Sequence, residues 1–272
     1  MAATANSIQY RIDGDDLQIV EISLAPGQSV VGEPGAMMVM DDCVSMDTVI
    51  GDGSSDVHFF SRLWRGLKRR FSGESMFSSV FSNPDSQPRS VAFAAPYPGK
   101  IVPIDLAQLG GPLICQKGAF LCGSAGLEVT LVLQKRFRVG LFGGEGFIMQ
   151  RISGQGLVFI HASGMLSEIR LQPEQALRVD TGCLAALQST VRYDIRYAGK
   201  LKTALFGGEG LFFASLRGPG TVWLQSLPIR RLAGRILENG MQQRSRSWGA
   251  RLYLILAILF ILFTLWAPEA PL

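Results

Sequence analysis

The chain has 272 residues, 31 of them glycine, and its 26 basic residues outnumber its 22 acidic ones to give a formal net charge of +4. This length is ample for a buried core, and the glycine content is typical of short strands joined by turns rather than of a helical bundle. The four cysteines form no CxxC pair and the two histidines have no partner at ligand spacing, which argues against a zinc site.

The first part of the chain is predicted to form β-strands. The segments SIQYRI and LQIVEISL flank the turn sequence DGDD, and LEVTLVLQ and VRYDIRY alternate apolar and polar residues further along. Apart from the basic segment described next, residues 10–225 contain no convincing helical period longer than two turns. The sequence therefore predicts an all-β body.

A short cationic segment, SRLWRGLKRRF, interrupts this β pattern. Its apolar stripe lies among basic residues, which suits the head-group layer of an anionic membrane. The alternative is a solvated loop in which Trp64 packs on its own domain, and a nucleic-acid role is disfavoured because no aromatic platform accompanies the charges. The residues predicted to contact the membrane here are Leu63, Trp64, Arg65, Leu67, Lys68, Arg69, Arg70 and Phe71.

An internal repeat is marked by the sequence LFGGEG, which occurs twice. Residues 141–163 align without gaps on residues 205–227, with nine of 23 positions identical. A third copy is found upstream, where GAMMV corresponds to the later GAFLC and GCLAA, and FSGESMF corresponds to LFGGEGF. The glycine-rich turn is not a phosphate-binding loop, because it lacks the lysine and the helix that such a loop requires.

The repeat singles out one glycine and one glutamate in each copy. The glutamates either brace the turn by accepting hydrogen bonds from backbone N–H groups or meet as a ring of carboxylates at a pseudo-threefold axis. The repeat residues are Gly35, Gly118, Gly182, Glu74, Glu145 and Glu209.

The C-terminal part is predicted to be helical. PIRRLAGRILENG has an apolar face, with Pro228 at its start and Gly240 at its end. The predicted domain map is a triplicated β body (1–227, units about 7–105, 106–163 and 164–227), an amphipathic helix and basic linker (228–247), a transmembrane anchor (248–267) and a short tail (268–272).

The transmembrane prediction rests on LYLILAILFILFTLWA, which carries no charge from 252 to 267. With the residues before it the segment reaches about 20 residues, enough to cross a bilayer. Basic residues before the span and aromatic residues near its ends predict a single-pass protein whose N-terminal body lies on the cytoplasmic face, in a bacterial inner membrane. The residues assigned to this role are Arg244, Arg246, Trp248, Arg251 and Trp266.

Several stretches together resemble the altered-inheritance-of-mitochondria family of bacterial and mitochondrial proteins: GEPGAMMVMDD, SGESMF, AAPYPGKIVPIDL, ICQKGAFLC and both LFGGEG sequences. The resemblance implies a fold like that of the tryptophan RNA-binding attenuation protein. The chain would then hold three short double-stranded β-helix units in a pseudo-threefold arrangement, and three chains would form a ring. The family supplies no catalytic residues to carry over.

The function favoured by the sequence is a non-enzymatic, tail-anchored scaffold or assembly protein for membrane organisation or membrane stress complexes. Its expected partners are anionic lipid head groups, further copies of itself in a homotrimer and other membrane-associated proteins, with no nucleic acid. A lipid or small-ligand binding module is the alternative. An enzyme is disfavoured, because His161 and Ser163 do not by themselves make a catalytic pair, and no cofactor, metal or catalytic residue is predicted.

Overall fold

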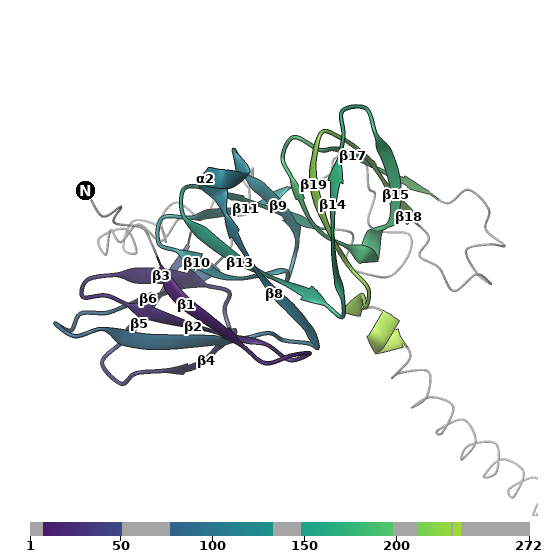
Figure 1. Cartoon of the computed structure of the whole chain (residues 1–272). Coiled ribbons are helices and arrows are strands. Elements are labelled where there is room, and N and C mark those ends of the chain that lie inside the picture. The colour runs from purple at the N-terminus through teal and green to yellow at the C-terminus, as the bar shows by residue number, and fades with distance from the viewer. Residues whose placement is uncertain (1–7, 51–76, 133–147, 198–211, 230, 235–272) are drawn as a thin grey trace, which may run out of the picture. The chain divides into compact units, whose positions relative to one another are not determined.

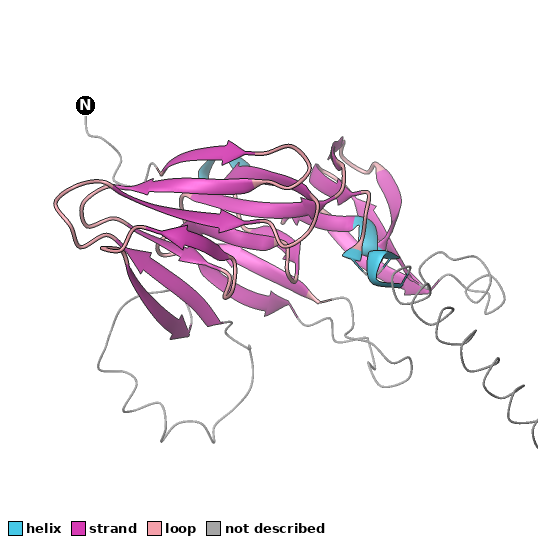
Figure 2. Cartoon of the chain, turned by 90° about the horizontal axis from the view of Figure 1, so that it is seen from below, coloured by secondary structure: helices cyan, strands magenta, loops and turns pink. Residues whose placement is uncertain are grey.

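A computed structural model describes residues 8–50, 77–132, 148–197, 212–229 and 231–234. The chain divides into two compact units, Met1–Pro228 and Ile229–Leu272. The first unit is built from antiparallel β-sheets, which Figure 1 shows in chain order and Figure 2 shows coloured by type of element. We call this unit the β body.

The strands of the β body are short, and glycine turns separate many of them. In chain order they are β1 (Gln9–Asp13), β2 (Ile19–Leu24), β3 (Ser29–Gly32), β4 (Met37–Met40), β5 (Ser45–Ile50), β6 (Phe77–Ser82), β7 (Arg89–Ala94), β8 (Gly99–Asp105), β9 (Leu113–Gln116), β10 (Phe120–Ser124), β11 (Glu128–Val132), β12 (Met149–Ser153), β13 (Leu157–Ser163), β14 (Leu166–Leu171), β15 (Ala176–Asp180), β16 (Leu184–Gln188), β17 (Arg192–Tyr197), β18 (Phe212–Arg217) and β19 (Gly220–Gln225). Two short helices, α2 (Leu106–Leu109) and η1 (Thr181–Cys183), lie between strands.

One pattern of strand pairing recurs three times, in β2–β7, β8–β13 and β14–β19. Within each set of six, the first and third strands pair with the sixth. The second and fourth strands pair with the fifth. The pairing of the third strand with the sixth shifts register at one equivalent place, after Met37, Phe120 and Leu184, each two residues beyond a repeat glycine. The structure thus gives a residue-by-residue correspondence between the three sets.

Neighbouring sets are joined edge to edge. The third strand of the second set pairs with the second strand of the first (β10 with β3), and β16 pairs with β9 in the same way. The result is four sheets, which we name sheet A (β1-β2-β7-β4), sheet B (β5-β6-β3-β10-β13-β8), sheet C (β11-β12-β9-β16-β19-β14) and sheet D (β15-β18-β17).

The hydrophobic cores follow this repeat. The first cluster joins Val20 and Phe93 of sheet A to Phe159 of sheet B, and the rings of Phe159 and Tyr10 meet edge to face with centroids 4.8 Å apart. The second and third clusters are built on the next two sets. Because strand residues alternate between faces, sheet B contributes to the first two clusters through opposite faces. Each set of six strands is therefore buried partly by its neighbour.

The predicted pseudo-threefold arrangement of the three units stays a prediction, because the described strands form three equivalent sets without a pairing that closes them. A body closed on itself would need β15 to pair with β4, as β3 pairs with β10 and β9 with β16. Within the described strands this third pairing is not formed, since β4 ends sheet A and β15 ends sheet D. The three sets follow one another with two open ends.

The predicted transmembrane helix and membrane localisation are corrected. In the part of the chain that the structure describes, no helix is long and apolar enough to cross a membrane. This finding contradicts the predicted tail anchor and the single-pass assignment, and the segment 248–267 itself lies outside the described residues. Of the predicted amphipathic helix, Ile229 and residues 231–234 are described, and they are helical.

A buried histidine lies where the first two sets join. His161 is 3% exposed, its ring centroid lies 5.9 Å from that of Tyr97, and its Nε2 has no hydrogen-bond partner among the described atoms. The equivalent residue in the third set is Gln225, whose Nε2 donates to Gln116 Oε1 (3.1 Å) and to the carbonyl of Gly182 (2.8 Å). The first junction therefore has an imidazole where the second has a well-bonded amide.

We expect this histidine to make stability depend on pH. Burial lowers the pKa of His161 below its ordinary value, so the folded state binds this proton less tightly than the unfolded state. The stability that neutral His161 contributes is then complete above about pH 6.5 and is lost as the pH falls toward the lowered pKa. Urea unfolding between about pH 5 and pH 7.5 measures this slope.

The matched variant is His161→Gln, which places the side chain of Gln225 at the equivalent position. It is expected to reduce the slope while keeping the fold. Burial raises the pKa of Glu33, which titrates in the opposite sense, so the difference between wild type and variant isolates the imidazole. Equal slopes in both proteins would contradict a role for His161.

Candidate functional site

The open ends of the β body are the outer edges of β4 and β15. In the two complete junctions, the edge equivalent to β4 is covered by the edge equivalent to β15 of the preceding set. The described residues provide no partner for the outer edge of β4 or for the outer edge of β15. A strand edge with unpaired N–H and C=O groups is a template for pairing with another chain.

Side chains on β4 are much more exposed than the equivalent side chains of the other two sets. Met38 and Val39 are 50% and 55% exposed. Their equivalents in the second set, Leu121 and Cys122, are 1% and 0% exposed, and both equivalents in the third set, at positions 185 and 186, are fully buried. These positions are apolar in all three sets, so the difference comes from the missing neighbour and not from the residue types.

The edge of β15 shows the complementary difference. Arg178 is exposed on this strand. The equivalent residues Val31 and Ile114 are buried, at 1% and 8% exposed, because a neighbouring strand lies beside each of them. Among the described strands, the outer edges of β4 and β15 are thus the two edges at which a neighbouring set is missing.

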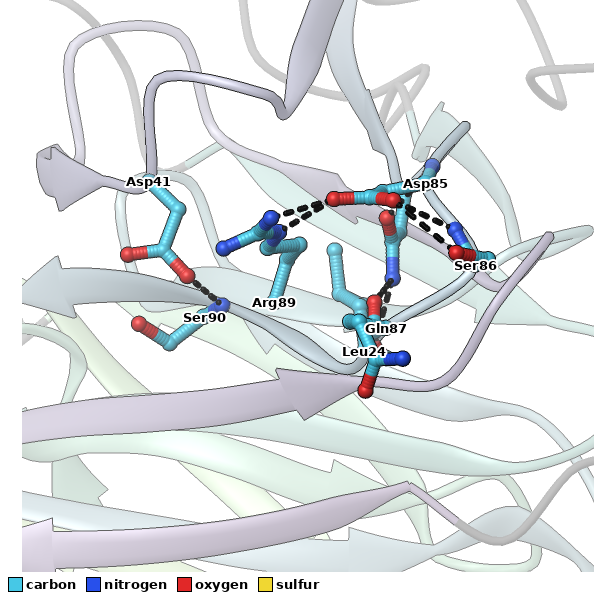
Figure 3. A network of polar contacts seen from close by, with 8 residues as sticks. Leu24, Asp41, Asp85, Ser86, Gln87, Arg89 and Ser90 are labelled. Carbon is cyan, nitrogen blue, oxygen red and sulfur yellow. Dashed lines mark hydrogen bonds and ion pairs between the residues drawn. The ribbon is translucent and has the colours of Figure 1, made fainter.

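The end of β4 is held in place by a polar network (Figure 3). Asp41 Oδ2 accepts a hydrogen bond from the backbone N–H of Ser90 (2.8 Å). The equivalent backbone N–H groups in the other sets donate to Ser124 Oγ (2.9 Å) and to Gln188 Oε1 (3.1 Å). Three different side chains therefore perform the same task, which fixes the third strand against the sixth.

An ion pair adjoins this network. Arg89 Nε donates to Asp85 Oδ2 (2.8 Å), and Arg89 Nη2 donates to the same oxygen. The hydrogen bond from Arg89 lowers the pKa of Asp85. Beside it, Asn83 Nδ2 donates to the carbonyls of Leu24 and Gln87, each at 2.9 Å. Figure 3 shows Asp85, Arg89, Leu24 and Gln87 together, and these contacts hold the turn that leads into β7.

Two of the other edge strands, β8 and β17, carry features that discourage pairing. β8 contains Pro103, which has no N–H to donate, and β17 carries Arg192, Asp194 and Arg196. Strand β4 has the sequence MMVM, with neither charge nor proline. β4 is therefore better suited to pairing than β8 or β17.

Most residues singled out by the sequence fall outside the described residues. These are Leu63, Trp64, Arg65, Leu67, Lys68, Arg69, Arg70, Phe71, Glu74, Glu145, Glu209, Arg244, Arg246, Trp248, Arg251 and Trp266.

The repeat glycines are described, and two of them behave alike. Gly35 and Gly118 have φ of +87° and +84°, a left-handed conformation that favours glycine, in the turns before β4 and β10. Gly182 instead lies in η1, where its N–H donates to Asp180 Oδ1 (2.7 Å). The structure places the three at equivalent points of the repeat and does not bring them together.

The edge residues Met38, Val39 and Arg178 were not identified from the sequence. The signal available was the alignment of GAMMV with GAFLC and GCLAA, which marks equivalent strands without telling which of them lacks a neighbour.

Metal and thiol chemistry receive no support from the described residues. Among them, no group of three His, Cys, Asp or Glu side chains is placed to hold a metal ion. Burial raises the pKa of the Cys115 and Cys122 thiols, which therefore stay protonated and unreactive near neutral pH. Cys43 is exposed.

Comparison with known proteins gives a consistent result. The chain is 30% identical over 238 residues to an uncharacterised protein of Streptococcus pyogenes serotype M6, an alignment covering 85% of this chain and 90% of the relative. A crystal structure of another Streptococcus pyogenes protein matches with a TM-score of 0.67 at 24% identity, covering 86% of this chain and all of the other, which shows a shared fold. The family model described as mitochondrial biogenesis AIM24 matches residues 10–227. The chain is a member of the AIM24 family.

Proposed function

We propose that this protein is a non-catalytic assembly protein whose β bodies associate head to tail, with β4 of one copy paired to β15 of the next. The observation that carries the proposal is the exposure of Met38 and Val39 at positions that are fully or almost fully buried in the other two sets. Pairing would remove this apolar surface from water and satisfy the backbone groups of both edges.

The repeat also supplies the register of this contact. Cys122 pairs with Gly32, and Ala186 pairs with Cys115. The equivalent contact between copies sets Val39 opposite Val179. By the same correspondence, Met40 lies opposite Arg178, and Asp41 lies opposite Leu177.

Charge favours the same contact. Arg178 is exposed on β15, whereas Asp41 and Asp42 follow β4 directly. In the inferred register Arg178 lies opposite Met40, close to the acidic residues that follow β4. Attraction between Arg178 and these carboxylates favours this pairing over pairing of two β4 edges.

A head-to-tail contact of this kind is compatible with a ring. The two surfaces differ, so the interface is head to tail, and it forms a closed ring wherever the rotation between copies closes. We propose a ring of three chains, in which the sheet missing between the ends of each chain is completed by its neighbours. The protein would then act as a scaffold with three equal positions.

Light scattering on the full-length chain tests the proposal. We expect one species with three times the 29.6 kDa chain mass that persists at micromolar concentration. A single species at the mass of one chain would overturn the proposed assembly.

A further inference from the structure

The outer edge of the first strand in each set, formed by β2, β8 and β14, also recurs three times. In the first set an additional strand occupies it, because β1 pairs antiparallel with β2. The register sets Tyr10 opposite Ile22, Arg11 opposite Glu21 and Ile12 opposite Val20. The molecule itself therefore shows which kind of segment this edge accepts.

The middle residue of this edge is Glu21 in β2, and its equivalents are Pro103 and Glu168. Each of the three lies opposite the same position of the sixth strand, occupied by Ala92, Phe159 and Trp223. In β8 the proline has no N–H and blocks strand addition. In β14 this residue is again a glutamate, as it is in β2, the strand with which β1 pairs.

The edge of β14 is vacant in the described part of the chain, where β14 is the last strand of sheet C. Glu168 and Arg170 are exposed, and Ile169 is half-buried, whereas its equivalent Ile22, which is covered by β1, is fully buried. Glu168 Oε2 accepts a hydrogen bond from Trp223 Nε1 (3.1 Å). A carboxylate accepts several hydrogen bonds, so this contact leaves capacity for a cation.

We propose that β14 is a docking edge for an extended segment of a partner protein in which a basic residue stands between two apolar ones. In β1 that pattern is Tyr-Arg-Ile. There, Arg11 Nη2 donates to Glu21 Oε2 at 2.8 Å, and Tyr10 packs on Phe159. The docked base pairs with Glu168, and the apolar residue on one side of it covers Ile169. Strand addition of this kind takes affinity from main-chain hydrogen bonds and specificity from alternate side chains.

This edge is separate from the edges proposed for assembly. β14 lies at the opposite side of sheet C from β11, and neither β4 nor β15 belongs to that sheet. Docking can therefore succeed or fail whether or not the chain forms rings.

The test uses the full-length chain and a fluorescein-labelled peptide with the sequence of residues 7–14, SIQYRIDG. Fluorescence anisotropy is expected to show saturable binding. Glu168→Pro imports the proline that the equivalent strand β8 tolerates, and it is expected to weaken binding about tenfold or more, because an N–H and a charge are lost together. Glu128→Lys, on the exposed edge strand β11, is the control and should bind like wild type.

A second test exchanges the charges of the peptide arginine and of Glu168. The peptide with Arg11→Glu should bind wild type several-fold more weakly, and Glu168→Lys should restore its binding. Absence of saturable binding to wild type overturns the proposal. Equal binding by Glu168→Pro shows that the peptide binds elsewhere, for example in place of β1 on β2, and also overturns it. If Glu168→Pro does not fold, the charge exchange decides, and failure of the exchange counts against β14.

Discussion

Replacing Val39 by lysine is expected to convert the assembly into single chains. Val39 is 55% exposed in the isolated body, so the change leaves the fold intact. In the ring it lies opposite Val179, which is 7% exposed, and an unpaired ammonium buried there costs several kcal/mol at each contact. Lysine is also a residue with which natural sheets block their edges. Light scattering should show the mass of one chain.

The control for this variant is Met165→Lys. Met165 is 72% exposed, in the turn between β13 and β14, and belongs to neither edge. It carries the same change of charge and should keep the mass of the wild-type assembly. If Val39→Lys and Met165→Lys have the same mass as wild type, β4 is not an assembly edge.

The β character of the body and its threefold repeat were accessible from the sequence, because both leave periodic signals. Alternating residues mark strands such as β11 and β17, and the repeat glycines mark equivalent turns. The pairing scheme was not accessible, since it depends on which strands meet across long separations. The pairing of β3 with β10 joins residues about ninety positions apart, and no local pattern specifies it.

The open ends of the repeat were not accessible for a related reason. Three copies of a unit do not state how neighbouring copies are joined, because this depends on the strand pairing at each junction. The edges proposed for assembly were missed because Met38 and its equivalents Leu121 and Ala185 are all apolar, and only the arrangement of the sets exposes the first of them.

The membrane assignment came from hydropathy, and the described part of the chain does not support it. The run of apolar residues at 252–267 indicates a segment suited to burial. It does not distinguish burial in lipid from burial against protein. The basic stretch of 62–70 was interpreted in the same way and lies outside the described residues.

The head-to-tail register is tested most directly by a cysteine pair, Met40→Cys with Arg178→Cys, in a chain whose exposed Cys43 is replaced by serine. The inferred register sets these two positions directly opposite each other in neighbouring copies. Opposed residues of an antiparallel pair have Cα atoms about 4.5–5.5 Å apart, within the range of a disulfide. The control pair is Met40→Cys with Arg192→Cys, in which the second cysteine lies on exposed β17, two strands away from the β15 edge.

Mild oxidation followed by denaturing electrophoresis without reductant gives the answer. We expect covalent dimers and trimers for the Met40–Arg178 pair and single chains for the control. Single chains for both pairs, or a disulfide formed only within one chain, would contradict head-to-tail assembly.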